Sequence, residues 1–349
     1  MNDKKHTTRV RLLHKAAAGL ILFIAVLLAG VFTFCSRAEA AWQLQAQVRT
    51  VKLKVSSVKK HGKKIDWHQF LPRKYRTSYH VLQGVETDGK YIYLNFWNQK
   101  QDKCVMVKVN AKSRKRTRVS APLRLYHGND IAYNPSSKLL YVVYSDRKPF
   151  QVTIVDRKTL TIRGYRTVRI PASLEGVENA RPSANAGGAV VSGNNQIITG
   201  VTGSGRSTNV DEMIGNTLRN ITGLVGITYN ANNHRFAMRV AGKNDFIILN
   251  EALIPLRYVA VTKTPSLRKQ SMDSDNKYVY ICMDKAGSYN LIMAYDWEGN
   301  FVKKFRVPLA YEIEGVFHIG KSFYAAFYNT HGPSSFVYKM KEFKKHLTK

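Results

Sequence analysis

Acidic and amide side chains recur in this sequence at positions where they could line one ligand site. Gln83, Asn129 and Gln270 occupy the same place in a repeated motif, and acids stand close to them in the chain. Carboxyl groups held near one another can act as general acid and base, for instance on a glycosidic bond. A narrow polar channel that holds only water or an ion is the alternative for the same residues. The candidates are Gln83, Glu86, Asn129, Asp130, Gln270, Asp273, Glu312 and Glu314, with His80, His127 and His318 nearby.

The strands expected to hold these residues form a repeat. Residues 83–93 read Gln-Gly-Val-Glu-Thr-Asp-Gly-Lys-Tyr-Ile-Tyr, which predicts a strand, a tight Asp-Gly turn and a second strand. Similar motifs begin at Asn129, Val225, Gln270 and Glu314, at successive intervals of 46, 96, 45 and 44 residues. A period of roughly 40–50 residues is typical of four-stranded blades arranged around an axis. The sequence therefore predicts an all-β β-propeller with the candidate residues at the mouth of its central channel.

The doubled interval between Asn129 and Val225 indicates a weaker repeat between them. Residues 187–198 fit that place, so we predict six blades with a degenerate third blade. Five blades is the alternative, if residues 171–223 are only an insertion. Apolar residues at helical spacing, with Asn209 and Glu212 as a capping pair, predict a short helix over residues 209–222.

Residues 1–41 have the pattern of a targeting segment. Five basic residues precede an apolar run over 16–34, and Ala38-Glu39-Ala40 offers a cleavage site, so this segment is a signal peptide or an N-terminal membrane anchor. We expect export to the cell surface or the medium. Residues 42–349 then form one propeller domain, in which the alternating segment 42–56 would close the last blade. Cys104 and Cys282 lie in strands of distant repeats, so we expect two buried free thiols.

The chain is strongly basic. Its formal net charge is +32, and residues 41–349 retain +28 because the first 40 carry six Lys/Arg and two Asp/Glu. Such an excess favours anionic partners. For an exported protein these are anionic cell-wall polymers or a membrane surface, with glycans as an alternative, and no nucleic acid is expected. The densest run supplies the expected binding residues Lys108, Lys112, Arg114, Lys115, Arg116 and Arg118.

No motif for a cofactor is present. The sequence lacks metal-ligand spacing of Cys and His, a Gly-x-Ser-x-Gly turn and a phosphate-binding loop, so we expect neither a metal nor a cofactor. Nothing in the sequence indicates the oligomeric state.

Two of the repeats resemble those of a known family. The segments 83–93 and 312–328 are similar to repeats of helveticin J-type proteins, which are large heat-labile bacteriocins of lactobacilli. The resemblance implies a secreted propeller that acts on the surfaces of related Gram-positive bacteria, and it carries over no catalytic residues. Two functions therefore stand side by side: a cationic propeller that binds the cell envelope, and a carbohydrate-active enzyme, a glycosidase or lyase, with acids at the channel mouth.

Overall fold

The computed structural model describes residues 50–144, 150–171, 220–261, 265–285 and 287–347, together with the backbone of the short strands at 190–191 and 197–198. These residues belong to one compact unit, which begins at Thr50. Among the described residues, no helix is long and apolar enough to cross a membrane.

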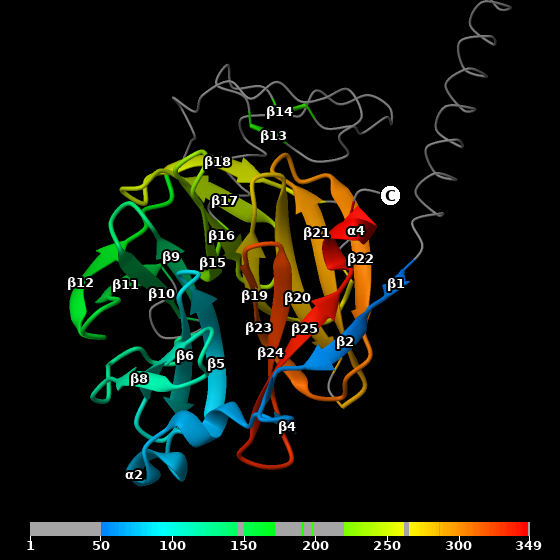
Figure 1. Cartoon of the computed structure of the whole chain (residues 1–349). Coiled ribbons are helices and arrows are strands. Elements are labelled where there is room, and N and C mark those ends of the chain that lie inside the picture. The colour runs from blue at the N-terminus through cyan, green and yellow to red at the C-terminus, as the bar shows by residue number, and fades with distance from the viewer. Residues whose placement is uncertain are drawn as a thin grey trace, which may run out of the picture. The chain divides into compact units, whose positions relative to one another are not determined.

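Five of the sheets that the described residues form, mainly antiparallel, are arranged around one centre (Figure 1). Each of these five sheets is a blade, and the strands β5, β9, β15, β19 and β23 lie innermost. Blade 1 contains β5 (Val81–Thr87), β6 (Tyr91–Asn98), β7 (Lys103–Asn110) and β8 (Arg116–Val119). Blade 2 contains β9 (Asp130–Asn134), β10 (Leu139–Val143), β11 (Gln151–Asp156) and β12 (Ile162–Thr167). Blade 3 contains β15 (Leu224–Asn230), β16 (Arg235–Val240), β17 (Phe246–Leu249) and β18 (Pro255–Val259). Blade 4 contains β19 (Arg268–Ser274), β20 (Tyr278–Lys285), β21 (Tyr289–Asp296) and β22 (Phe301–Val307). Blade 5 contains β23 (Glu312–Ile319), β24 (Ser322–Tyr328) and β25 (Ser335–Lys341).

The β-propeller prediction is confirmed, but the main prediction of six blades is wrong. In place of a separate third blade, the strands β13 (Val190–Val191) and β14 (Ile197–Ile198) extend the sheet of blade 3, where Val190 pairs with Val259 of β18. An outer strand exposes unpaired backbone groups, so a nearby segment with strand propensity can pair with it without building a new sheet. The five-blade alternative is therefore the one observed. The helix expected over 209–222 falls largely outside the described residues, and its last residues, 220–222, are not helical.

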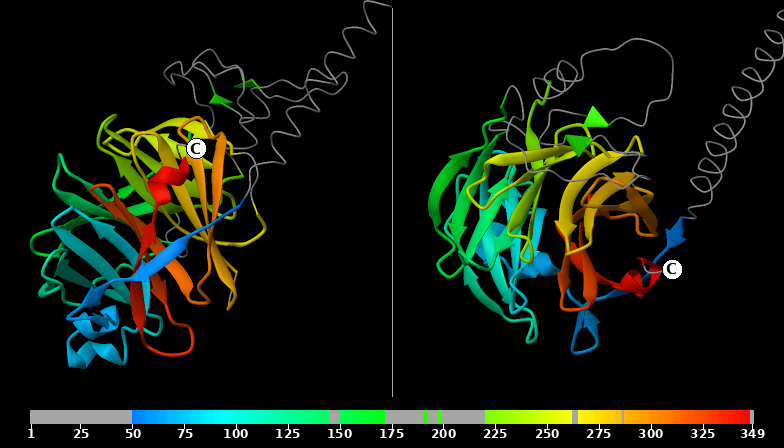
Figure 2. Two further views of the ribbon diagram at one scale, coloured as in Figure 1. Left: turned by 45° about the vertical axis from the view of Figure 1, so that its right-hand side comes forward. Right: turned by 90° about the horizontal axis from the view of Figure 1, so that it is seen from above.

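The N-terminal residues join the last two blades. β2 (Lys54–Ser57) pairs antiparallel with β25, with Val55 opposite Met340, and supplies the outermost strand of blade 5. Just before it, β1 (Val51–Lys52) pairs parallel with β22 of blade 4, and Leu53 between them is buried. Figure 2 shows this blue segment against the orange and red strands. Residues 42–49 of the expected closing strand lie outside the described residues.

Apolar residues fill the spaces between neighbouring blades. Each of five clusters of buried side chains combines residues from two adjacent sheets, and the cluster with Val85, Phe317 and Val337 joins blade 5 to blade 1. The ring is thus closed by hydrophobic packing. Cys104 and Cys282 are buried free thiols within these clusters.

Asp and Asn side chains shape the turns within the blades. Asn110 Oδ1 accepts hydrogen bonds from the backbone N–H groups of Lys112 and Ser113, and Asp156 Oδ1 does the same for Lys158 and Thr159. These short side chains satisfy N–H groups that the strand ladders leave free.

Short helices flank the propeller strands. The 3-10 helix η1 (Trp67–Phe70) and the helix α2 (Arg73–Arg76) precede β5, and α4 (Phe343–Leu347) follows β25 and ends the described chain. Trp67 packs in the cluster between blades 5 and 1, and Phe343 packs in the cluster between blades 4 and 5. The segments that precede β5 and follow β25 are therefore both anchored in the core.

Candidate functional site

The inner strands surround the axis of the propeller and distribute the candidate residues along it. We call the end where these strands begin the N-terminal mouth and the end where they finish the C-terminal mouth. A β-bulge interrupts the pairing of β5, β15, β19 and β23 near the aligned repeat positions, so the side chains there depart from strict alternation. Toward the N-terminal mouth lie Gln83, Asn129, Gln270, Glu312 and Glu314; Asp130 is central; Glu86 and Asp273 lie toward the C-terminal mouth.

The acids at the N-terminal mouth belong to a hydrogen-bonded network. Arg268 Nη2 lies 2.8 Å from Glu312 Oε1, and Gln270 Nε2 donates to the same oxygen at 2.7 Å. Arg268 also pairs with the buried Asp284. Burial raises the pKa of Glu312, and the positive charge of Arg268 partly offsets this rise. Burial also raises the pKa of Glu314 well above the usual range. Burial therefore favours the neutral form of the Glu314 carboxyl group beside this network.

Asp130 ties three blades together at the centre. Its Oδ2 accepts hydrogen bonds from Ile227 N of β15 at 3.0 Å and from Met272 N of β19 at 2.9 Å, and its Oδ1 accepts one from Ile131 N. Burial raises the pKa of Asp130 to about 8, while these N–H groups and the Arg239 guanidinium act in the opposite direction. These contacts indicate that the Asp130 carboxyl group serves to hold the inner strands together. At the aligned positions of the other inner strands the residues are small: Gly84, Gly226, Ser271 and Gly315.

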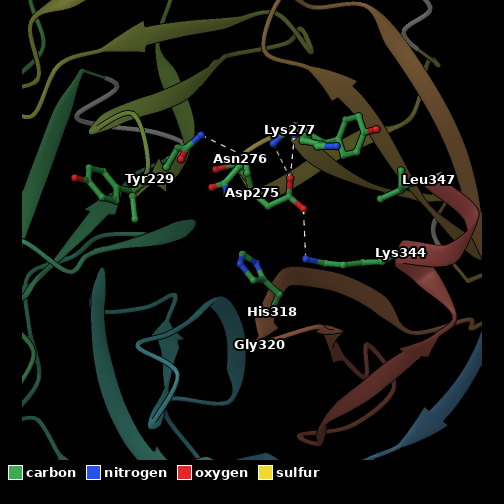
Figure 3. Close-up of a pocket in the computed structure, with 12 residues that line it drawn as sticks. Tyr229, Asp275, Asn276, Lys277, His318, Gly320, Lys344 and Leu347 are labelled. Atoms are coloured by element: carbon green, nitrogen blue, oxygen red, sulfur yellow. Dashed lines mark hydrogen bonds and ion pairs between the residues drawn. The ribbon is translucent and has the colours of Figure 1, made fainter.

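A pocket opens at the C-terminal mouth, where β15, β19 and β23 finish (Figure 3). Its volume is about 440 Å³, within the range of small-molecule sites. Tyr229 and Leu347 provide apolar wall, and the α4 helix closes one side. The polar lining consists of Asn230, Ser274, Asp275, Asn276, Lys277, His318 and Lys344.

The imidazole of His318 faces this pocket and is held by a carboxylate. His318 Nδ1 lies 3.0 Å from Asp273 Oδ2, and the His318 side chain is 32% exposed whereas that of Asp273 is 6% exposed. Asp273 raises the pKa of His318, although burial acts against it. Behind the pair, burial and the Asp273 carboxylate raise the pKa of Glu86 well above its usual range, although Glu86 keeps some accessible surface. Because Nδ1 is bound to Asp273, the Nε2 of His318 is the ring nitrogen left for the pocket.

The second carboxylate of the pocket is saturated by the protein. Asp275 Oδ1 accepts from the backbone N–H groups of Lys277 and Tyr278, and its Oδ2 accepts from Tyr280 Oη at 2.8 Å. Lys344 Nζ lies 3.5 Å from the same Oδ2. The groups left to meet a ligand are thus mainly donors.

Sequence reasoning missed most of this pocket. It placed His318 near the predicted channel, but it gave Lys344 no part in a site. The spacing of Phe343 and Leu347, four residues apart, is the signal of a helix face that packs on the propeller, and both side chains are buried. His127 instead stacks on Trp97 with ring centroids 4.1 Å apart, and neither His80 nor His127 lines the pocket.

The basic run of blade 1 is divided between buried and exposed positions. Lys108 is 7% exposed, its Nζ donates to Arg157 O at 3.0 Å, and it lies 4.1 Å from the Tyr91 ring centre. Arg114 is half-buried near Trp67. Lys112, Lys115, Arg116 and Arg118 are exposed.

A second basic segment joins this run. The hairpin of β3 (Lys59–Lys60) and β4 (Lys63–Lys64) reaches the turn between β7 and β8, where Lys60 Nζ lies 3.4 Å from Arg114 O. Arg116 Nη1 donates to Phe70 O at 2.8 Å, which fixes the same turn. We call the resulting surface the basic rim, made of Lys59, Lys60, Lys63, Lys112, Lys115 and Arg116.

Within the described part of the chain, no group of three or more His, Cys, Asp or Glu is placed to hold a metal ion. Comparison of the sequence with models of protein families and with curated proteins finds no match.

Solved structures similar to this chain differ widely in sequence. Hydrazine synthase of Kuenenia stuttgartiensis matches at 12% identity with a TM-score of 0.37 over 77% of this chain, which spans 59% of the synthase chain. Regucalcin, a calcium-binding protein from Agrobacterium tumefaciens, matches at 11% identity with a TM-score of 0.41, over 76% of this chain and 91% of regucalcin. The RRP9 WD40 repeats match at 9% identity with a TM-score of 0.39, over 84% of this chain and 99% of that one. At such low identities and TM-scores, these likenesses indicate nothing about function.

Proposed function

We propose that this protein is exported and binds anionic polymers of the bacterial cell envelope through its basic surface. The observation that carries the proposal is the separation of charge between interior and surface. Among the acidic residues that the structure describes, only Glu251 and Glu342 are exposed, and the others are partly or fully buried. Exposed lysines occur on all five blades, for example Lys112, Lys158, Lys243, Lys285 and Lys321.

The basic rim is the proposed centre of the contact. Its lysines come from two segments about 50 residues apart, and the contact of Lys60 Nζ with Arg114 O joins these segments. Lys63, Lys112 and Lys115 are exposed and make no side-chain hydrogen bond or ion pair within the described residues. They are therefore free to meet the phosphate groups of a polymer.

The arrangement of the acids supports binding over the alternative of a carbohydrate-active enzyme. An enzyme of that kind requires an acid pair at one open site. At one mouth Glu312 is paired with Arg268 and Glu314 is buried. At the other, Asp273 is buried and paired with His318, so neither of these sets offers two open acids. The pocket at the C-terminal mouth presents mostly donors.

The test is co-sedimentation of the protein with purified Gram-positive cell walls, before and after chemical removal of their anionic polymers. Raising the salt from about 0.05 to about 0.5 M shortens the Debye length from roughly 14 to 4 Å, so most of the bound protein should be released. Walls without anionic polymers should retain little. Retention that survives high salt, or that does not need the polymers, would refute the proposal and favour recognition of a neutral glycan.

A matched pair of variants locates the contact. Substitution of Lys63, Lys112 and Lys115 by Gln removes three positive charges from the basic rim. By analogy with nucleic acids, it should reduce the slope of log affinity against log salt by about 2. The control substitutes Lys103, Lys158 and Lys321, which are also exposed but lie elsewhere on the propeller. It should change retention much less, and equal losses would show that the rim is not the contact.

The helveticin J-type activity implied by the sequence resemblance would be a consequence of such binding. It predicts that the protein kills or inhibits Gram-positive cells and that the basic-rim variant loses this effect together with wall retention. A viability assay on sensitive cells, run with both triple variants, checks this step separately from binding.

A further inference from the structure

The pocket at the C-terminal mouth offers more hydrogen-bond donors than the protein itself uses. His318 Nε2 and Lys277 Nζ make no hydrogen bond within the described residues, and Lys344 Nζ has one ion pair at 3.5 Å. The two carboxylates nearby, Asp273 and Asp275, are already engaged by donors of the protein. A ligand therefore meets positive charge and N–H groups.

The three basic groups come from separate parts of the propeller. His318 belongs to the end of β23, Lys277 to the turn after β19, and Lys344 to the helix α4 (Figure 3). Figure 3 shows the imidazole of His318 and the side chain of Lys344 extending into the same space, next to Asp275. Three donors that converge from different elements suit a group with several acceptor oxygens.

The size and walls of the pocket define the rest of the ligand. A volume of about 440 Å³ is larger than a single oxyanion needs, and Asn230, Asn276 and Ser274 add polar groups to the lining. Tyr229 and Leu347 cover one part with apolar surface. Hydroxyl groups on a short carbon chain or ring would match this mixture.

We propose that the pocket binds a phosphate monoester of a polyol or sugar, with the phosphate between His318 and Lys344. This site is distinct from the basic rim and does not depend on polymer binding there. The ester is either a free small molecule or the terminal group of a phosphate-containing polymer, and both present the same chemistry to the pocket.

The direct test is isothermal titration calorimetry of the full chain with glycerol 3-phosphate, and with glycerol at the same concentrations. We expect saturable binding of the ester and no binding of glycerol. Lys344→Gln should weaken the affinity for the ester about tenfold or more, since it removes a charged donor. The matched control is Lys345→Gln on the same helix: Lys345 pairs with Glu342 and does not line the pocket, so this variant should bind like the unaltered protein.

Three results would overturn the proposal: no binding of the ester by the unaltered protein, equal binding of glycerol, or equal losses in the Lys344 and Lys345 variants. His318→Gln provides a second pocket variant on another element, and it should also weaken binding. If it binds the ester as well as the unaltered protein, the assigned phosphate position is wrong.

Competition distinguishes the two sources of the ester. If the pocket takes the terminal group of a wall polymer, an excess of glycerol 3-phosphate lowers the fraction of protein that sediments with walls. If it takes a free ester, sedimentation is unchanged while calorimetry still shows binding. Either result supports the site. Failure of the calorimetric test leaves salt-sensitive wall binding intact, so the two proposals can fail separately.

Discussion

Gly315 lies where the first and last blades meet at the axis, and an added methyl group there has no room. A Cβ built on Gly315 of β23 would lie 2.3 Å from Val85 Cγ1 and 3.4 Å from Val85 N of β5. The backbone of Gly315 is not in the left-handed region, so alanine introduces no conformational strain of its own. Gly315→Ala therefore tests packing alone.

The expected cost follows from overpacking a rigid core. Inner strands cannot move apart without disturbing the packing on both sides, so we expect Gly315→Ala to lower the free energy of unfolding by about 1–3 kcal/mol. For a domain of this size, that corresponds to a Tm lower by roughly 2–10 °C. Gly164→Ala on β12 is the control, because a Cβ there meets no atom within 4 Å, and it should change the Tm little.

A double mutant identifies the clashing partner. Val85→Ala removes the Cγ1 atom that the new methyl group would hit, at a cost of about 2 kcal/mol for the lost packing. Because the clash is then absent, the double mutant should lose at least ~1 kcal/mol less than the sum of the single changes. Denaturant unfolding of the four proteins measures this coupling. Additive losses, or a Gly315→Ala variant as stable as Gly164→Ala, would refute the packing at the axis.

Two further predictions concern the buried titratable groups. Asp130→Asn should destabilise the protein by about 1–3 kcal/mol, because a single amide oxygen cannot accept all three N–H groups and at least one is left unpaired; an unchanged denaturation midpoint would contradict this role. The free energy of unfolding should also fall as the pH rises from mildly acidic values to about 9. The pKa values of Asp130 (about 8), Glu86 and Glu314 are raised in the folded state, so the folded protein binds protons more strongly than the unfolded chain does. The raised pKa of His318 acts with the same sign. A series of Tm measurements across this range checks the sign, and a Tm that rises toward pH 9 would contradict it.

Much of the fold could be predicted from local sequence. Strand, tight turn and strand recur at 83–93 and 312–328 because alternating apolar residues and Asp, Asn or Gly turns determine local geometry. These patterns involve residues close together in the chain, so a single sequence is enough to recognise them. The same signals predicted free buried thiols at Cys104 and Cys282, and both are buried and unpaired.

The number of blades and the grouping of the candidates depended on tertiary structure. Whether residues 187–198 formed a blade or lengthened one was decided by the pairing of Val190 with Val259, a contact between segments almost 70 residues apart. The alternation of a strand indicates which residues are buried, but it does not indicate which neighbour they meet. For that reason the acids that looked equivalent in the repeat divide between the two mouths. Lys108 is likewise buried, although Lys112, Lys115, Arg116 and Arg118 of the same basic run are exposed. The pocket with His318 and Lys344 likewise depends on the folded ring, which brings α4 beside the end of β23. No local pattern links a strand end to a helix 26 residues later.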